Sequence, residues 1–360
     1  IACLNLEGEI SYDLETSGLS VAELNLATPQ SRVNATGRTT ISGNLPTDLK
    51  GQIRLNLPEF GLYDAGVLTG EWAAIRGAQN SSRFSVDIRG TGLADTEELY
   101  GWLGETVRLR MEGNVSDEGA VNVPRLGLSL ASGNLTGSLN RATNGRLIAD
   151  TEFHTSDSYP LVDMIPGAIL KMRAEGQTDD LSLNGSFEAV TIAAGGAELV
   201  SPRLQFDGRF AEQVLNGALA VTGQLENDPL NVRTNISLDG QNWSVDDLQG
   251  YWRELNLTGD FRGLGGDLEE LVGEAHLVGD LPEGLPAKGV DLTAFRQKGN
   301  LKITGLVEDV NSGPLTSASI NLDVSGTVER ADYAFDINGL LTVSEVTQEA
   351  DIALSGEVVA

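Results

Sequence analysis

Cysteine is almost absent from the sequence: Cys3 is the single one among 360 residues. An internal disulfide and a zinc site with several cysteine ligands are therefore excluded. Aromatic residues make up only 5 %, which is few for a conventional core. Long apolar runs are also missing. The longest candidate, Leu161–Leu170, contains Asp163 and Pro166 and is shorter than the ~18 residues that a membrane-spanning helix needs.

Basic residues are scarce as well. The sequence has 24 Lys+Arg against 52 Asp+Glu, which gives a formal net charge of −28. Such a charge opposes binding to nucleic acid and to the head groups of an anionic membrane. An acidic surface is also typical of proteins from salty habitats. The charge therefore predicts that nucleic acid is not a partner and indicates little else about function.

Glycine, by contrast, is abundant, with 43 of 360 residues. This share is well above the usual ~7 % and indicates many turns or many special backbone positions. Apolar and polar residues alternate along most of the chain. In Ile320–Glu329, the even-numbered residues are apolar or glycine and the odd-numbered ones are polar. This period of two predicts strands with one dry and one wet face, as in antiparallel sheets.

The alternation contains a repeated motif, L-x-L-x-G, in which the glycine takes an apolar position. The glycines of these copies are Gly113, Gly185, Gly223, Gly259, Gly305, Gly326, Gly339 and Gly356. Around them, the apolar positions are Leu109, Met111, Leu181, Leu183, Phe187, Leu219, Val221, Leu255, Leu257, Phe261, Leu301, Ile303, Leu322, Val324, Phe335, Ile337, Ile352 and Leu354.

The alternation continues in the same phase past each glycine, so we expect the strands to run through the glycines. A mid-strand glycine costs roughly 0.5–1 kcal/mol against alanine. On an inward face it removes the side chain that resists bending toward that face. The pattern predicts a mainly β fold, a long antiparallel meander bent into a taco-like groove (a U-shaped β-sheet) with an apolar inside. The alternative is a β-sandwich in which the glycines fill tight spots.

Three short segments interrupt the strand pattern with helix-like sequence: Asp95–Glu105, Tyr159–Lys171 and Gly266–Gly273. Each is followed by strands, which suggests an internal repeat of short helix plus meander. No biased linker divides the chain, so residues 1–360 are predicted to form one continuous segment. The chain starts without methionine and stops within the pattern at Ser355–Ala360. We therefore expect a piece of a longer protein, whose membrane anchor or targeting signal lies outside it.

No motif in the sequence indicates catalysis. His154 and His276 are far apart and lack metal spacing, so both are interpreted as structural. A glycosidase pair cannot be chosen among the carboxylates, because nothing singles out two of them. The loop Arg262–Leu271 lacks the third glycine of a phosphate-binding fingerprint. We therefore expect no catalytic residue, cofactor or metal, and the protein is predicted not to be an enzyme.

The repeated L-x-L-x-G strands, the short "PLVDMIPG"-like segment and the meanders without catalytic residues resemble the TamB branch of the AsmA-like proteins. The resemblance covers the whole segment. It rests on the general pattern of residue types along the chain and not on an invariant motif. It implies a bridge-like protein of the Gram-negative envelope that is anchored in the inner membrane and crosses the periplasm. It also implies a groove that holds phospholipid acyl chains, and an outer-membrane barrel partner of the TamA type.

Two features of that family are missing from the sequence: the amino-terminal anchor and the carboxy-terminal region that meets the barrel. Contacts with the barrel partner therefore fall outside this segment. On this hypothesis, the chain conducts phospholipid between the two membranes and supports the assembly of outer-membrane proteins. The alternative is a β-rich secreted adhesin or scaffold that fills its own interior and carries no lipid.

Overall fold

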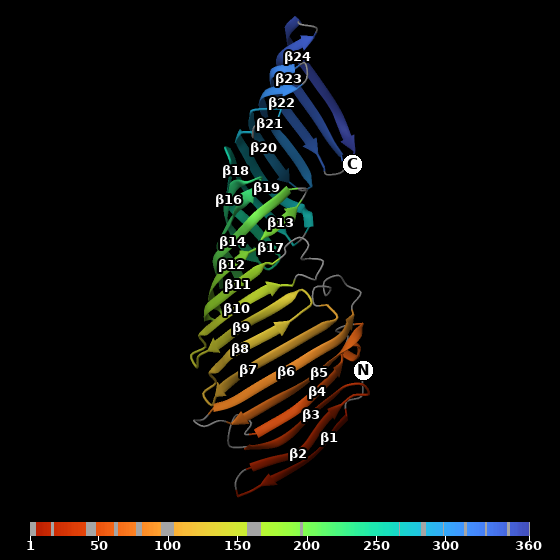
Figure 1. The fold of residues 1–360 in the computed structure, drawn as a ribbon, viewed down its shortest axis with the longest axis vertical. Helices are drawn as coiled ribbons and strands as arrows, with labels where there is room; N and C mark the ends of the chain where they lie inside the picture. Colours follow the sequence, from red (N-terminus) through yellow and green to blue (C-terminus); the bar gives the residue numbers. More distant parts are fainter. Residues whose placement is uncertain are drawn as a thin grey trace. The chain divides into compact units, whose positions relative to one another are not determined.

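The computed structural model describes residues 5–15, 18–40, 48–60, 64–76, 81–94, 104–156, 167–194, 197–265, 267–281, 286–297, 299–312, 315–327, 330–343 and 346–359. The chain divides into two units, Ile1–Ala194 (unit 1) and Gly195–Ala360 (unit 2). Both consist of antiparallel strands that follow one another in chain order (Figure 1). The prediction of a mainly β, antiparallel meander is confirmed.

Unit 1 is a meander in which β1 to β12 pair successively. Its strands are β1 (Asn5–Asp13), β2 (Gly18–Ala27), β3 (Arg32–Thr40), β4 (Asp48–Asn56), β5 (Ala65–Arg76), β6 (Ser81–Ala94), β7 (Thr106–Ser116), β8 (Val121–Ser129), β9 (Gly133–Arg141), β10 (Leu147–Thr155), β11 (Ile169–Gln177), β12 (Asp180–Glu188) and β13 (Thr191–Ala194).

Unit 2 is a second meander, from β14 to β24. Its strands are β14 (Ala197–Ala211), β15 (Val214–Leu225), β16 (Asp228–Asp239), β17 (Asn242–Trp252), β18 (Leu255–Leu264), β19 (Asp267–Asp280), β20 (Gly289–Gln297), β21 (Asn300–Ser312), β22 (Leu315–Gly326), β23 (Arg330–Val343) and β24 (Val346–Val359).

Tight turns keep the successive strands of unit 2 in register. Glu212 and Gln213 both have positive φ angles (53° and 68°), as do Glu226 and Asn227 (52° and 71°). Two consecutive residues with positive φ make a type I′ turn, whose twist matches that of the strands it joins. The β14–β15 and β15–β16 hairpins therefore close with two-residue loops.

Several strands contain a bulge at a non-glycine residue with positive φ. In β17, Asp247 has a φ of 56° and the register shifts between Val245 and Leu248. Val245 pairs with Phe261 and Leu248 with Gly259, so both residues stay in the apolar phase although they are three positions apart. The bulge absorbs one residue and preserves the alternation of faces.

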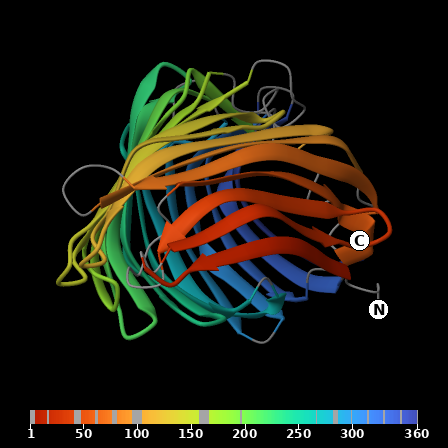
Figure 2. The ribbon, with the colours of Figure 1, turned by 90° about the horizontal axis from the view of Figure 1, so that it is seen from below.

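The sheets are single layers and they are bent. The strands of unit 1 bow along their length, as Figure 2 shows for β2 to β6. Among the described residues, the strong contacts between elements join neighbouring strands, apart from the contact between β5 and the 3-10 helix η1 (Leu57–Phe60). The side chain of Glu59 in η1 accepts hydrogen bonds from Thr28 Oγ1 and Ser31 Oγ (both 2.5 Å) and fixes the β2–β3 turn.

The surface area agrees with a single layer. The chain exposes 22370 Å² for a mass of 38.1 kDa. A compact protein of this mass exposes about 14,000 Å², and two separate compact bodies of half the mass about 17,000 Å² together. Both faces of the sheets therefore remain largely accessible. The alternative of a β-sandwich is not supported for the described residues.

The predicted helix at Gly266–Gly273 is wrong, because Asp267–Asp280 form strand β19. Its acidic start and following leucines fit a helical turn, but eight residues are too few for a stable isolated helix. Pairing with β18 and β20 instead satisfies its backbone groups. The end of the second predicted helix, at Ile169–Lys171, belongs to β11. Most of the rest of that helix, and Asp95–Leu103 of the first, lie outside the described residues.

Candidate functional site

The register of unit 2 aligns apolar residues in a continuous row that crosses all its strands. Each member pairs directly with the next on the neighbouring strand. We call these residues the unit 2 apolar row: Leu204, Val221, Val232, Gly250, Leu257, Leu277, Leu292, Gly305, Leu322, Phe335 and Leu354. With strands spaced about 4.8 Å apart, the row is about 48 Å long.

Unit 1 has an equivalent row. The unit 1 apolar row crosses β1 to β12 and consists of Leu6, Leu26, Val33, Ile53, Gly70, Ile88, Leu109, Leu128, Leu135, Phe153, Leu170 and Phe187. At the same strand spacing it is about 53 Å long. No member of either row is polar. The side of each sheet that carries its row is called the apolar face below.

A second row of unit 2 runs beside the first. Gly259 pairs with Ala275, Ile303 with Val324, and Val324 with Tyr333. Leu219 belongs to the same face but pairs with Thr234, a buried polar residue whose Oγ1 donates a hydrogen bond to the carbonyl of Asp246 (2.9 Å). The buried hydroxyl of Thr234 therefore has a hydrogen-bond partner at the bulge.

The remaining predicted residues lie on the same faces. Met111 pairs with Val86 and Leu126, and Leu183 with Ala174. Leu181 pairs with Gly176. In unit 2, the partners are Trp252 for Leu255, Gly273 for Phe261, Gly326 for Leu301, and Ile352 for Ile337. The sequence alternation therefore placed these residues in one phase, and the strand pairing brings them together within each unit.

Sequence reasoning missed several members of the apolar face, among them Ile88, Leu128, Leu204, Val232, Leu277 and Leu292. The strands of Ile88, Leu204 and Leu277 contain a glycine two or four positions further on in the same phase, Gly90, Gly208 and Gly279, so the motif itself was a signal that could have found them. The strands of Leu128, Val232 and Leu292 have no such glycine, and for them the alternation alone was the available signal.

Most of the apolar face is half-buried, but Leu6, Leu26 and Leu170 of the unit 1 apolar row are exposed. Leu109, Leu257 and Val324 have intermediate exposure, whereas polar neighbours such as Arg110 and Thr258 are exposed. Leu255 is buried, at 8 %. Near the end of unit 2, Leu354 is 50 % exposed. A face covered by a second layer would contain many fully buried large side chains, and the described residues contain none.

Aromatic rings of the apolar face lie over glycines of neighbouring strands. A Cβ atom built on Gly113 would lie 2.7 Å from the Phe84 ring. The Phe261 ring blocks Gly273 in the same way, and the Tyr333 ring blocks Gly356. Such packing of a ring on a glycine stabilises a sheet that would otherwise lose contacts there.

Other glycines of the motif allow close approach of the backbone. A Cβ on Gly259 would lie 2.5 Å from the carbonyl oxygen of Glu274, and one on Gly305 would clash with the carbonyl oxygen of Asp291. At Gly223, Gly326 and Gly339 a Cβ would meet Leu199, Ala331 and Ala318. These glycines therefore provide room for neighbours, the role that was expected for them only in the β-sandwich alternative. That these glycines together allow the sheet to bend stays a prediction, as does any role of Gly185.

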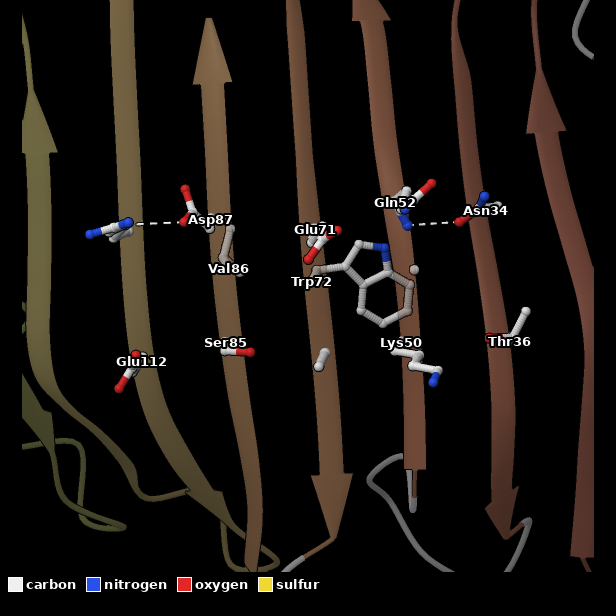
Figure 3. Close-up of a pocket in the computed structure, with 13 residues that line it drawn as sticks. Asn34, Thr36, Lys50, Gln52, Glu71, Trp72, Ser85, Val86, Asp87 and Glu112 are labelled. Carbon is white, nitrogen blue, oxygen red and sulfur yellow. Dashed lines mark hydrogen bonds and ion pairs between the residues drawn. The ribbon is translucent and has the colours of Figure 1, made fainter.

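The opposite, polar face of unit 1 contains an open hollow of about 720 Å³ across β3 to β7. Most residues that line it belong to the polar phase, including Lys50, Gln52, Glu71, Asp87 and Glu112 (Figure 3). The backbone amide of Gln52 donates a hydrogen bond to Asn34 Oδ1 (2.7 Å). This hollow is mainly polar, although Gly51, Trp72 and Val86 of the apolar phase also line it.

Asp87, which lines this hollow, accepts hydrogen bonds from two arginines of β7. Arg108 donates two hydrogen bonds to its carboxylate (2.9 and 2.6 Å), and Arg110 donates a third (3.2 Å). The hydrogen bonds from Arg108, together with the one from Arg110, lower the pKa of Asp87 from 3.8 to about 2. The ionised carboxylate thus holds two arginines of β7 beside one another.

The interaction of Asp87 with the two arginines should make the stability of the fold depend on pH in acid. Because the pKa of Asp87 is lower in the folded state, the carboxylate stabilises the fold above pH 4 and loses that effect as the pH falls toward 2. In Asp87→Asn, we expect a lower urea midpoint at pH 7 and a shallower fall between pH 4 and pH 2 than in the unmodified protein. A parallel fall in the two proteins would contradict this assignment.

The histidines and two of the tryptophans have structural partners. His154 Nε2 lies 2.6 Å from Glu152 Oε1, and His276 Nε2 lies 2.7 Å from Asp291 Oδ1. Trp243 Nε1 donates a hydrogen bond to the carbonyl of Gly265 (2.9 Å), and Trp252 Nε1 to that of Leu225 (3.0 Å). Within the described ranges, no group of three or more His, Cys, Asp or Glu side chains is arranged to hold a metal ion.

None of the helices in the described part of the chain is long and apolar enough to cross a membrane. The chain matches no protein-family model. No curated protein sequence matches it either.

Proposed function

We propose that the apolar face holds phospholipid acyl chains and that this chain is a segment of a periplasm-spanning protein that conducts phospholipids between the inner and outer membranes. The observation that carries the proposal is the continuity of the two apolar rows. An acyl chain lying along either row would meet only apolar side chains and glycines over the full width of that unit.

The energetics favour occupation of the face. Apolar surface in contact with water costs about 25 cal/mol per Å². A lipid tail covering the face would remove that cost, and each buried CH₂ would contribute about 0.8 kcal/mol. Since a bilayer offers the tail nearly the same gain, transfer between bilayer and protein would be close to balanced. Near balance suits passage of lipid better than storage.

The function requires no catalytic residue, cofactor or metal. The working groups are the side chains of the apolar rows, and the exposed acidic surface keeps the sheets soluble. On this proposal, anchoring in the inner membrane and contact with an outer-membrane barrel of the TamA type, which together support the assembly of outer-membrane proteins, belong to regions outside this segment. The second candidate is a β-rich secreted adhesin or scaffold, favoured only by the glycine-rich, acidic and cysteine-poor composition.

Lipid extraction from the purified protein separates the two candidates. The chain would be purified from Gram-negative cells without detergent, and bound lipid would be identified by mass spectrometry. We expect phospholipid at about one or more molecules per chain, because each row is longer than one acyl chain. A folded protein that contains no lipid would contradict the proposal and favour the scaffold.

A further inference from the structure

The polar face of unit 1 carries a concentration of positive charge that the overall charge of −28 conceals. From β3 to β8, its polar phase contains nine basic side chains and four carboxylates. The basic ones are Arg32, Arg38, Lys50, Arg54, Arg83, Arg89, Arg108, Arg110 and Arg125. An excess of positive charge on one face of an acidic protein invites an anionic partner.

Four of these side chains lie in one cross-strand row. Arg32 pairs with Arg54, Arg54 with Thr69, Thr69 with Arg89, and Arg89 with Arg108. We call Arg32, Arg54, Arg89 and Arg108 the arginine row. It extends over four strand spacings, or roughly 19 Å. Like charges placed directly opposite one another destabilise a sheet. The stability of the sheet therefore does not explain why these arginines lie in one row.

Within the described part of unit 1, only the ends of the row, Arg32 and Arg108, have carboxylate partners. Arg108 binds Asp87, and Arg32 lies 3.6 Å from Glu23. Arg54 and Arg89 are exposed, and neither forms a hydrogen bond or ion pair with any described residue. Among the residues that the structure describes, the two guanidinium groups at the centre of the row therefore have no partner, and their donors can bind an external anion.

We propose that the arginine row docks unit 1 on the head groups of an anionic phospholipid bilayer. Guanidinium groups bind phosphate oxygens in pairs of parallel hydrogen bonds. A bilayer presents many phosphates in one plane and meets an exposed sheet face without the ordering cost that a flexible acidic peptide would pay. Repulsion from the acidic remainder is screened beyond about 8 Å at physiological ionic strength, so the charges in contact dominate.

This inference does not depend on acyl chains binding the apolar face, since the row lies on the opposite face of the sheet. It also differs from the expectation, drawn from net charge alone, that the acidic chain opposes binding to anionic head groups. The relevant quantity is the local charge of the face in contact.

The test is flotation of the whole purified chain with vesicles. One set would contain phosphatidylcholine alone and the other an equal mixture of phosphatidylcholine and phosphatidylglycerol. Arg54→Glu/Arg89→Glu is the test variant. The control is Arg233→Glu/Arg262→Glu, which makes the same charge change at exposed polar positions of unit 2 that likewise have no partner among the described residues.

We expect preferential, salt-sensitive flotation with the anionic vesicles. Binding should fall about tenfold or more in the test variant and be retained in the control, because each basic residue near an anionic surface adds to the attraction. Equal flotation with both vesicle types, or equal loss in both variants, would overturn the proposal. Binding to immobilised polyglutamate without binding to anionic vesicles would also overturn it and would indicate an acidic protein partner.

Discussion

Replacing Leu257 with aspartate is expected to reduce the phospholipid that co-purifies with the chain by about tenfold or more. Leu257 lies in the middle of the unit 2 apolar row, between Gly250 and Leu277. A carboxylate at this point would interrupt the row with a charged group that an acyl chain cannot solvate. Thr258→Asp is the control, since Thr258 is the next residue and is exposed on the polar face.

A second pair of variants separates loss of lipid from loss of fold. Leu257 is half-buried, so a charge there also removes packing. Leu354 belongs to the same row but is 50 % exposed, and Ser355 follows it on the polar face. We expect Leu354→Asp to lower lipid content without a large change in the urea midpoint, and Ser355→Asp to leave both unchanged. Equal lipid content in all four variants would contradict the role of the row.

Replacing Gly305 with valine is expected to destabilise the protein by about 2 kcal/mol or more. A Cβ at this position would overlap the carbonyl oxygen of Asp291 on β20 and lie 2.7 Å from Leu292 Cδ2. Because the obstacle is backbone, rotation of a side chain cannot relieve it, and the pairing of β20 with β21 would have to shift. Urea unfolding followed by circular dichroism measures the effect.

Gly127 provides the matched control. It lies in mid-strand in β8, and a Cβ built there meets no atom within 4 Å. Valine favours strands and reduces the freedom of the unfolded chain, so Gly127→Val is expected to be neutral or slightly stabilising. If both valine variants lost the same stability, the cost would come from strand glycines in general and not from close approach at Gly305.

The alternation of apolar and polar residues allowed the strands and their faces to be predicted. A strand with one apolar and one polar face shows this alternation in its sequence. Leu322 and Val324 were predicted on one side and Asp323 on the other, and the pairing with β21 and β23 confirms this arrangement. The unbroken phase through Gly305 and Gly326 likewise indicated strands that run through their glycines. Gly305 does lie within β21, whereas Gly326 is the last residue of β22.

Features that depend on pairing could not be predicted. The arginine row exists only because Arg54 and Arg89 lie on the strands on either side of β5, and nothing in either strand specifies the register of its neighbour. The bulge at Asp247 has no glycine to mark it. Segment Gly266–Gly273 was misassigned because local helix signals were judged without the adjacent strands that bind its backbone.

Photo-crosslinking in cells measures whether acyl chains lie against the apolar face. A photoreactive residue would replace Leu257, with Thr258 as the control position one residue away on the other face, and adducts would be identified by mass spectrometry. We expect phospholipid adducts at position 257 and none at position 258. A folded protein with no lipid adduct at position 257, or with equal adducts at both positions, would contradict the claim that acyl chains occupy the apolar face.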